Sequence, residues 1–249
     1  MIHPILQPQT LSLTRDLVIG SSTREGGVSE GSYESLNLSL NTSDRLEHVR
    51  ENRRRWFAAL GIAEAGLGIP NQVHSGTVKV ISEPGQVPEC DALVTREPGL
   101  FLSVLTADCT PVLIWSKKAR AVAAVHAGWR GTASGILART LTTMQAELDC
   151  VPQDLQVYIG PGLGVDNFEV GSEFRDIFAS TYLHQAHGSL RFDNTAALVA
   201  QAVKAGVSLD HIESSSHCTF ADSDLFFSHR RDRGITGRMM SVIGFHEFS

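Results

Sequence analysis

The chain has 249 residues, a net charge of −6 at pH 7 and a composition, 42% hydrophobic and 19% charged, that is typical of a folded globular protein rather than a disordered or fibrous one. The acidic balance argues against general attraction to nucleic acid or to an anionic membrane, and no apolar run approaches the roughly 18 residues of a membrane-spanning helix. With no export signal in the first residues, we expect a cytoplasmic protein that has neither nucleic acid nor membrane as a partner.

The first clear helix signal is the segment 43–61. Asp44 and Glu47 have the spacing of a capping box, and apolar residues recur at helical intervals up to Gly61, which is expected to end the helix. The three consecutive arginines at 53–55 are expected to form a solvated face of this helix.

Four short segments that follow are rich in β-branched and aliphatic residues and are separated by turn signals. We expect them to form central strands, at residues 77–81, 100–107, 111–115 and 121–128. A helix is expected from Thr132 to residue 148, because the apolar residues of that segment share one helical face.

The rest of the chain continues to interleave the two element types, but without a regular order. Further strands are expected at residues 155–160 and 210–216, and further helices at 172–183 and 194–206. No repeat, low-complexity tract or charged linker divides the sequence. We therefore expect an α/β fold of α+β-like organisation, in which a single domain of residues 1–249 contains a mixed β-sheet flanked by helices.

The turn between the segment 121–128 and the next helix contains Gly128, Arg130 and Gly131. Backbone N–H groups at the start of a helix, together with an arginine, suit an anion. The two glycines are equally well explained by a tight turn that needs their φ angles. The fragment lacks the complete Walker or dinucleotide-binding pattern, so both interpretations stay open.

Three residues that could bind a metal lie at or near the ends of predicted strands. Cys109 follows Asp108 at one strand end, His126 closes the apolar segment 121–126, and His74 lies in a polar turn before a third strand. Two imidazoles and a thiolate suit zinc and leave a fourth, open position. Taken alone, each such residue is more often part of the core, and sequence spacing does not show that the three converge.

A series of segments from about Thr23 to Phe245 resembles one protein family. In order, they are TREGGVSEGSYESLNLSL, NQVHSGTVKVI, CDALVT, LTADCTPVLIW, VAAVHAGWRGTASGIL, IGPGLGVDNFEVG and FFSHRRDRGITGRMMSVIGF. Together they are similar to the multicopper polyphenol oxidase or laccase-domain family, also called purine nucleoside phosphorylase or peptidoglycan editing factor. The elements TADC and HAGWRG are its most specific marks.

The resemblance implies a role for the three candidate ligands. In the family, the histidine of QVH, the cysteine of ADC and the histidine of HAGWRG bind zinc, and these residues correspond here to His74, Cys109 and His126. Zn²⁺ is therefore the expected cofactor, with copper as an alternative. The resemblance also implies a metal in a surface pocket and a single-domain α/β fold related to bacterial cysteine-dependent toxin hydrolases.

The sequence departs from the family pattern at three positions. Gly162 and Ala221 stand where cysteines are common, and His229 stands where tyrosine is common. The two missing cysteines are not zinc ligands, but their absence weakens an oxidase function that needs several copper sites with soft ligands. The change at His229 bears on local substrate contacts.

The first function implied by the resemblance is phosphorolysis of purine nucleosides: adenosine above all, and inosine, guanosine and methylthioadenosine. Arginines hold phosphate oxygens with paired donors, so Arg24, Arg130 and, more weakly, Arg231 are candidate phosphate contacts. Asn37 is a candidate contact for a ribose hydroxyl. Each arginine is as readily explained by surface charge, and Asn37 by its own turn. The expected partners are a small-molecule nucleoside and phosphate, bound by a monomer or a homodimer.

Other activities stay open beside phosphorolysis. A zinc site would also allow deamination of adenosine, which we rank as a side activity because the signature of the zinc deaminases is absent. The family further implies hydrolysis of a cell-wall precursor amide, either through the metal or by attack of Cys109 with His126 as the base. Oxidation of phenols through copper ranks lowest. A purely structural zinc is disfavoured because structural sites usually have four protein ligands.

Overall fold

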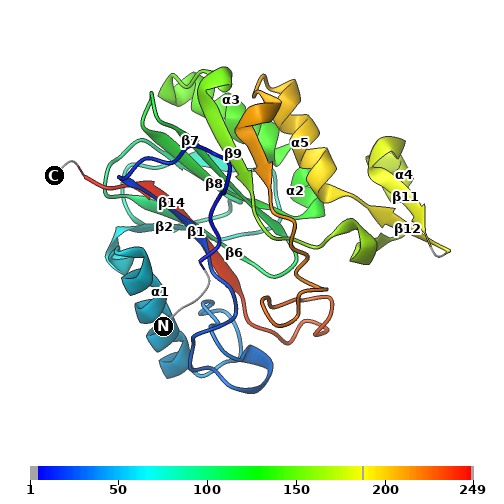
Figure 1. Cartoon of the computed structure of the whole chain (residues 1–249), viewed down its shortest axis with the longest axis horizontal. Coiled ribbons are helices and arrows are strands. Elements are labelled where there is room, and N and C mark those ends of the chain that lie inside the picture. The colour runs from blue at the N-terminus through cyan, green and yellow to red at the C-terminus, as the bar shows by residue number, and fades with distance from the viewer. Residues whose placement is uncertain (1–4, 187, 248–249) are drawn as a thin grey trace.

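The computed structural model describes residues 5–186 and 188–247. The expected domain limits, residues 1 and 249, therefore lie outside the described residues. Two large β-sheets form the centre of the molecule, and a small third sheet extends from one side (Figure 1). The expectation of one mixed sheet was therefore wrong in number, although both large sheets do mix parallel and antiparallel strands.

One large sheet has five strands, two of which join it in parallel. In spatial order they are β1 (Leu17–Ser21), β14 (Met239–Phe245), β6 (Phe101–Thr106), β2 (Leu67–Pro70) and β4 (Gly85–Val87). The other large sheet has six strands with antiparallel pairing at its centre. In spatial order they are β13 (Ile212–Ser214), β9 (Leu155–Ile159), β7 (Thr110–Ser116), β8 (Ala121–Ala127), β5 (Ala92–Thr95) and β3 (Val78–Val80).

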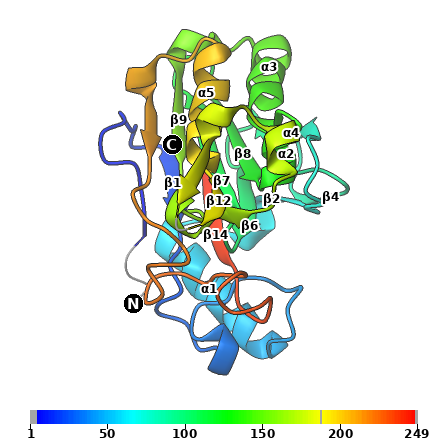
Figure 2. The ribbon, with the colours of Figure 1, turned by 90° about the vertical axis from the view of Figure 1, so that its right-hand side faces the viewer.

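Helices cover the two outer faces of the stacked sheets. The helices α3 (Ile136–Leu148) and α5 (Asn194–Lys204) pack their apolar faces on the six-stranded sheet. The helix α1 (Leu46–Leu60) packs Trp56 and Phe57 on the outer face of the five-stranded sheet. Both views place α1 on the side opposite α3 and α5, with the sheets between them (Figures 1 and 2).

The four-layer arrangement explains the continuous apolar runs of the central strands. All seven residues of β7 and all seven of β8 are buried, because one face of their sheet meets α3 and the other meets the second sheet. Trp115 and Tyr158 fill the space between the sheets. The predicted strands at 77–81, 100–107, 111–115, 121–128, 155–160 and 210–216 are confirmed as β3, β6, β7, β8, β9 and β13.

The turn between β6 and β7 carries the chain from one large sheet into the other. It consists of Ala107, Asp108 and Cys109, and Asp108 has a left-handed backbone with a φ of 85°. A non-glycine residue adopts that conformation only where its surroundings hold it there. A cysteine predicted at a strand end thus lies where the two sheets meet.

The small sheet and the short helix α4 (Phe174–Ile177) form the extension seen at the side of Figure 1. Its antiparallel strands are β10 (Glu169–Val170), β12 (Ser189–Phe192) and β11 (Leu183–Ala186). The single helix expected at 172–183 was wrong, because Phe178 is extended and packs its ring 4.1 Å from that of Phe192. Aromatic packing therefore overrides the local helical pattern.

The helix expected to begin at Thr132 is divided into two. The helix α2 (Trp129–Ala133) ends near Ser134, and α3 begins after Gly135, whose φ of 72° lies in the left-handed region that glycine readily adopts. The helix expected at 194–206 is confirmed as α5, and the Asp193 side chain caps its first turn. Within the described residues, no helix combines the length and the apolar character needed to cross a membrane.

The start of α1 differs from the expected capping box. The N-cap residue is Arg45, whose side chain makes no cap hydrogen bond. The Asp44 carboxylate instead accepts hydrogen bonds from Ser29 and Asn37. The acidic residue that resembled a cap therefore stabilises the preceding loop.

The end of α1 is as expected, but its arginine run is not. Gly61 ends the helix in a left-handed conformation, as expected. The run is not a uniformly solvated face, because Arg53 is buried, forms an ion pair with Glu64 at 2.6 Å and donates to the Leu38 carbonyl. Arg54 is exposed, so adjacent residues of the run point in different directions.

The buried side chain of Asn52 connects α1 to the long loop that precedes it. Its Oδ1 accepts a hydrogen bond from Val28 N, and its Nδ2 lies within donating distance of Ser29 Oγ and of the Ser35 and Asn37 carbonyls. No part of this amide is exposed. It therefore holds the loop that leads into one wall of the cavity described below.

Replacing Asn52 with alanine should lower the free energy of unfolding by about 3 kcal/mol, because several buried polar groups would lose their partner at once. Urea denaturation followed by circular dichroism measures this change. The matched control is Arg54→Ala on the exposed face of the same helix, which should cost about 0.5 kcal/mol or less. Equal effects of the two substitutions would contradict this role of Asn52.

Candidate metal centre and active site

Three segments that are distant in the sequence bring the candidate ligands together. His74 lies in the loop between β2 and β3, Cys109 in the turn that crosses between the sheets, and His126 near the end of β8. One nitrogen of each imidazole and the sulfur of Cys109 all lie within 4.8 Å of one another. The two imidazole rings meet edge to face, with centroids 4.9 Å apart. We call these three residues the His–Cys–His cluster.

The cluster has the donor set and spacing of a metal site. Two imidazole nitrogens and one sulfur can converge on a single ion, and three protein ligands leave a coordination position for a further group. A histidine that binds a metal commonly donates its other N–H to a carboxylate, and His126 Nδ1 lies 2.8 Å from Asp91 Oδ1. His126 therefore has its other nitrogen, Nε2, available to the cluster.

The fully buried Asp91 also fixes the position of His74. Its carboxylate accepts hydrogen bonds from the backbone N–H groups of Val73, His74 and Ser75 and from the Ser75 hydroxyl. These bonds hold His74 in a left-handed backbone conformation, with a φ of 60°. One carboxylate thus orients two of the three cluster residues.

Glycine at position 128 allows the cluster to close. A Cβ atom there would lie 2.9 Å from Cys109 Sγ and 3.3 Å from a ring carbon of His74. The φ of Gly128 is −71°, which any residue can adopt, so the requirement is for space rather than for backbone freedom. The following helix, α2, has only five residues, which is little more than one turn. The helix dipole at its start is therefore small.

Charges within the cluster shift its pKa values. Burial opposes ionisation of Cys109, but the charge of His126 and hydrogen bonds from His126 and His74 outweigh it and lower the thiol pKa from 9.0 to about 6. Burial likewise opposes the charged form of His126, yet Cys109 and Asp91 raise its pKa to about 9. Without a metal, the favoured form at neutral pH is therefore a thiolate beside an imidazolium.

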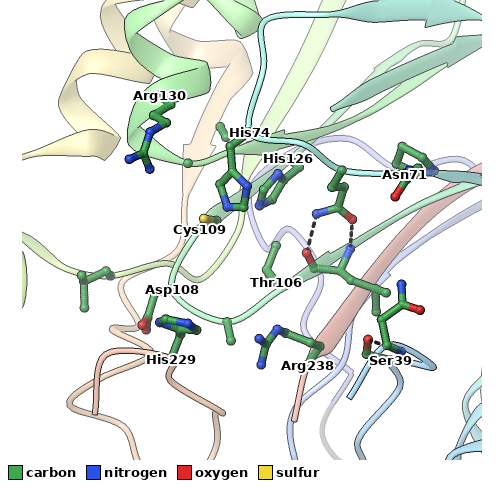
Figure 3. A pocket seen from close by; sticks show the side chains of 18 of the residues that line it. Ser39, Asn71, His74, Thr106, Asp108, Cys109, His126, Arg130, His229 and Arg238 are labelled. Atoms are coloured by element: carbon green, nitrogen blue, oxygen red, sulfur yellow. Dashed lines mark hydrogen bonds between the residues drawn. The ribbon is translucent and has the colours of Figure 1, made fainter. Parts of the chain in front are cut away.

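The cluster opens into a cavity of about 580 Å³. Figure 3 shows the three cluster side chains at its centre, with Arg130 on one side and Arg238 and His229 on the other. The Gln72 amide, which makes two hydrogen bonds with the backbone of Leu105, forms part of the wall. The cavity is therefore open to a ligand on more than one side of the cluster.

Of the four predicted substrate contacts, the structure brings one to the cavity. Arg130 lines it, is exposed and places its guanidinium 4.3 Å from the centre of the Trp129 ring. Arg24, Asn37 and Arg231 do not line it.

Each of the three residues outside the cavity has hydrogen-bond partners within the protein. Arg24 donates to the Glu34 and Ser223 carbonyls and lies over Phe227. The Asn37 side chain is buried and bonds within and next to its own turn, as the alternative interpretation expected.

Arg231 likewise supports the C-terminal loop. Its guanidinium donates to the carbonyls of Thr219, Phe220 and Phe226 and pairs with Asp232. These contacts engage both terminal nitrogens.

Asp108, the residue before Cys109, is held in place by residues from the C-terminal part of the chain. Its carboxylate accepts hydrogen bonds from the Thr219 and Ser228 hydroxyls and from the backbone N–H of Arg230. Its carbonyl accepts a further bond from Leu163 N. These contacts hold the left-handed conformation of Asp108 and therefore the direction in which Cys109 leaves the turn.

Sequence reasoning did not assign a role to Asp91, Asp108 or Arg238. Asp91 lies in CDALVT and Arg238 in the last segment of the family resemblance, but neither has a spacing that reveals its partners. The one available signal was a charged residue directly beside a strand that is otherwise apolar. Such residues need a partner when they are buried.

Comparison with known proteins identifies the family. Residues 18–246 match the family model described as multi-copper polyphenol oxidoreductase laccase. The chain is 39% identical over 230 residues to the purine nucleoside phosphorylase YfiH of Escherichia coli (strain K12), an alignment that covers 90% of this chain and 91% of the relative. It is 39% identical over 227 residues to a purine nucleoside phosphorylase of Deinococcus radiodurans, covering 90% and 87% of the two chains. The chain belongs to this laccase-like family.

Solved structures share the whole fold. YlmD from Geobacillus stearothermophilus superposes with a TM-score of 0.89 at 34% identity, covering 94% of this chain and 93% of the other. The Neisseria meningitidis protein NMB0706 superposes with a TM-score of 0.84 at 34% identity, covering 98% and 99%. The fold is thus a single mixed α/β domain with several mixed sheets, which confirms the expected class.

The lowered pKa of Cys109 can be measured by alkylation of metal-free protein. Only the thiolate reacts, so the rate of iodoacetamide modification at Cys109 should be half-maximal near pH 6 and should fall below that pH, whereas an unperturbed thiol would be half-maximal near pH 9. Mass spectrometry of the peptide that contains Cys109 provides the rate. In His126→Gln the midpoint should rise. A wild-type midpoint near pH 9 would contradict the thiolate–imidazolium pair.

Proposed function

We propose that this protein is a zinc-dependent purine nucleoside phosphorylase. Adenosine is the main substrate, followed by inosine, guanosine and methylthioadenosine, and slow deamination of adenosine is a side activity. In the main reaction the C1′–N9 bond of the nucleoside breaks and a phosphate oxygen forms the new bond to C1′. The products are the sugar 1-phosphate, which is ribose 1-phosphate for adenosine, inosine and guanosine, and the free purine, which takes up a proton at the departing nitrogen.

The observation that carries this proposal is the His–Cys–His cluster at the centre of a cavity with arginines on two sides. A volume of about 580 Å³ is in the usual range for a small-molecule site. The relatives named purine nucleoside phosphorylase are similar over about nine tenths of the chain. Together these points favour a nucleoside and an oxyanion as the ligands.

We assign the metal site to His74, Cys109 and His126, with zinc as the metal. The soft thiolate and two borderline imidazoles match Zn²⁺, and the Asp91 carboxylate lies at His126 Nδ1, which leaves Nε2 of His126 for the metal. A bound metal would supply Lewis acidity to an oxygen of the substrate or of phosphate. The protein side chains provide the orientation.

Arg130 is the proposed phosphate contact on the exposed side of the cluster. Stacking on Trp129 restricts its guanidinium without occupying its N–H donors, which keeps them available for an anion. Two N–H groups of one guanidinium can hold two phosphate oxygens at once. In this proposal, phosphate binds on the side of the cavity that Arg130 lines.

A second function, hydrolysis of an aminoacylated cell-wall precursor, is favoured by one specific observation. Cys109, His126 and Asp91 have the order of a nucleophile, a base and an orienting carboxylate, with 2.8 Å between His126 Nδ1 and Asp91 Oδ1. In this alternative Cys109 attacks the amide carbonyl, His126 gives a proton to the leaving amine, and a water molecule then hydrolyses the thioester to release the acid and restore the Cys109 thiol. The proposed relation to cysteine-dependent toxin hydrolases would fit this chemistry.

Copper-dependent oxidation of phenols is the third candidate and ranks lowest. That function needs several copper sites, whereas the part of the chain that the structure describes contains one group of three or more possible metal ligands, the His–Cys–His cluster.

The proposal also includes a cytoplasmic location and a monomeric or homodimeric state.

The decisive experiment incubates zinc-loaded protein with adenosine in the presence and absence of phosphate and identifies the products by mass spectrometry. With phosphate, adenine and ribose 1-phosphate should form. Without phosphate, adenine formation should stop and at most slow formation of inosine should remain, because deamination requires water and no phosphate.

The matched variants are Cys109→Ser and Cys150→Ser. The first should abolish both activities, because a hydroxyl is a far poorer zinc ligand than a thiolate. The second changes a buried cysteine outside the cluster and should keep both activities. If no adenine forms with phosphate, but an aminoacylated cell-wall precursor is cleaved, the hydrolase replaces the phosphorylase.

A further inference from the structure

We propose that Arg238 is a phosphoryl-binding residue, which takes either the inorganic phosphate of the reaction or the 5′-phosphate of a nucleotide bound as substrate or inhibitor. The inference rests on the proposed function for the identity of the ligand, but the anion site itself follows from the surroundings of Arg238. The surroundings of Arg238 differ from those of the other arginines that line the cavity.

The Arg238 guanidinium is held from one side and open on the other. Its Nη1 donates to the Thr236 and Gly237 carbonyls, at 2.8 and 2.9 Å. The backbone N–H of Arg238 donates to Asn37 Oδ1, and its carbonyl accepts from Leu38 N. Within the described part of the chain, hydrogen-bond partners are found for Nη1 but not for Nε or Nη2. One edge of a fixed guanidinium is therefore available to a ligand.

The charge of Arg238 is half-buried and has no ion-pair partner among the described residues. Burial lowers its pKa, and the acidic groups that act against this effect are Asp108, Cys109 and Tyr33. The Asp108 carboxylate is already engaged by two hydroxyls and a backbone N–H, as described above. A bound anion would offset the cost of keeping this cation away from water.

The remaining arginines of the cavity differ in this respect. Arg53 forms an ion pair with Glu64. Arg230 is exposed to water, and its Nη1 donates to the carbonyls of Asn167 and Glu169. Arg130 is exposed, so water already solvates it. Arg238 is thus the cavity arginine with the most to gain from an anion.

The position of Arg238 suggests the class of ligand. Figure 3 shows it across the His–Cys–His cluster from Arg130, so that a ligand in the centre of the cavity has one arginine on either side. A planar guanidinium with a free edge matches two oxygens of a phosphoryl group. A nucleoside and phosphate, or a nucleotide, would present such oxygens there.

The test is isothermal titration calorimetry of zinc-loaded protein with inorganic phosphate, with AMP and with adenosine. Arg238→Gln should weaken binding of phosphate or AMP by about tenfold or more, because a charge-assisted pair of hydrogen bonds is lost. Adenosine affinity should change little. Arg238→Lys, which keeps the charge but not the fork, should show an intermediate loss.

The matched control is Arg230→Gln, which removes one positive charge from the same cavity and should change anion affinity by roughly threefold or less. Zinc content and thermal melting of each variant show whether metal and fold are kept. A loss confined to phosphate identifies the co-substrate as the ligand, and a loss confined to AMP identifies a nucleotide 5′-phosphate. Either result supports the site.

Two results would overturn the proposal. One is phosphate and AMP binding within about twofold of wild type in both Arg238 variants, which is below the loss expected for a charged contact. The other is wild-type protein that binds neither anion. The anion site and the proposed function can fail independently. If anion binding depends on Arg238 but no adenine forms, the anion site is supported and the phosphorylase function is refuted.

Discussion

The hydrogen bonds of one buried carboxylate, that of Asp91, determine whether the cluster can form. Asp91 precedes β5 and is fully buried, so its charge is tolerated only because several donors surround it. Burial would raise its pKa, but hydrogen bonds from His126 and Ser75 lower it to about 2. The carboxylate is therefore charged throughout the physiological pH range. That charge orients His126 and holds the loop of His74.

The third cluster residue depends on the stacking of the two sheets. Cys109 lies in the turn between β6 and β7, which crosses from the five-stranded to the six-stranded sheet. Asp108 holds this turn through contacts with the C-terminal loop, and Gly128 leaves room for the sulfur. Residues from the middle and from the C-terminal part of the sequence thus fix the position of Cys109. The same C-terminal region supplies Arg238 to the cavity, so the fold and the proposed anion site are built together.

Several features of the fold and of the cluster could be predicted from the sequence, for identifiable physical reasons. The central strands β6, β7 and β8 were located to within about one residue, because burial on both faces produces continuous apolar runs. The cluster residues were found from their chemical types and from the family resemblance. Their convergence required the structure, since ligands from separate strands have no fixed spacing.

What the sequence did not reveal depends on partners that are far away along the chain. Arg24 and Arg231 were predicted to bind phosphate, but backbone carbonyls, including one nearly 200 residues from Arg24, occupy their guanidinium groups. Asp91 was missed because most of its partners are backbone N–H groups, which every sequence contains. The helix expected at 172–183 failed because aromatic packing in the side extension outweighs local propensity.

The most direct test of the central claim is the zinc affinity of Asp91→Asn, measured by competition with a chelator. We expect a loss of about 10- to 100-fold relative to wild type, because His126 and His74 would no longer be oriented. Asp222→Asn is the matched control, since Asp222 accepts from His217 Nδ1 at 3.0 Å outside the cluster. Its zinc affinity should equal that of wild type. An unchanged affinity in Asp91→Asn would contradict the claim that this carboxylate organises the His–Cys–His cluster.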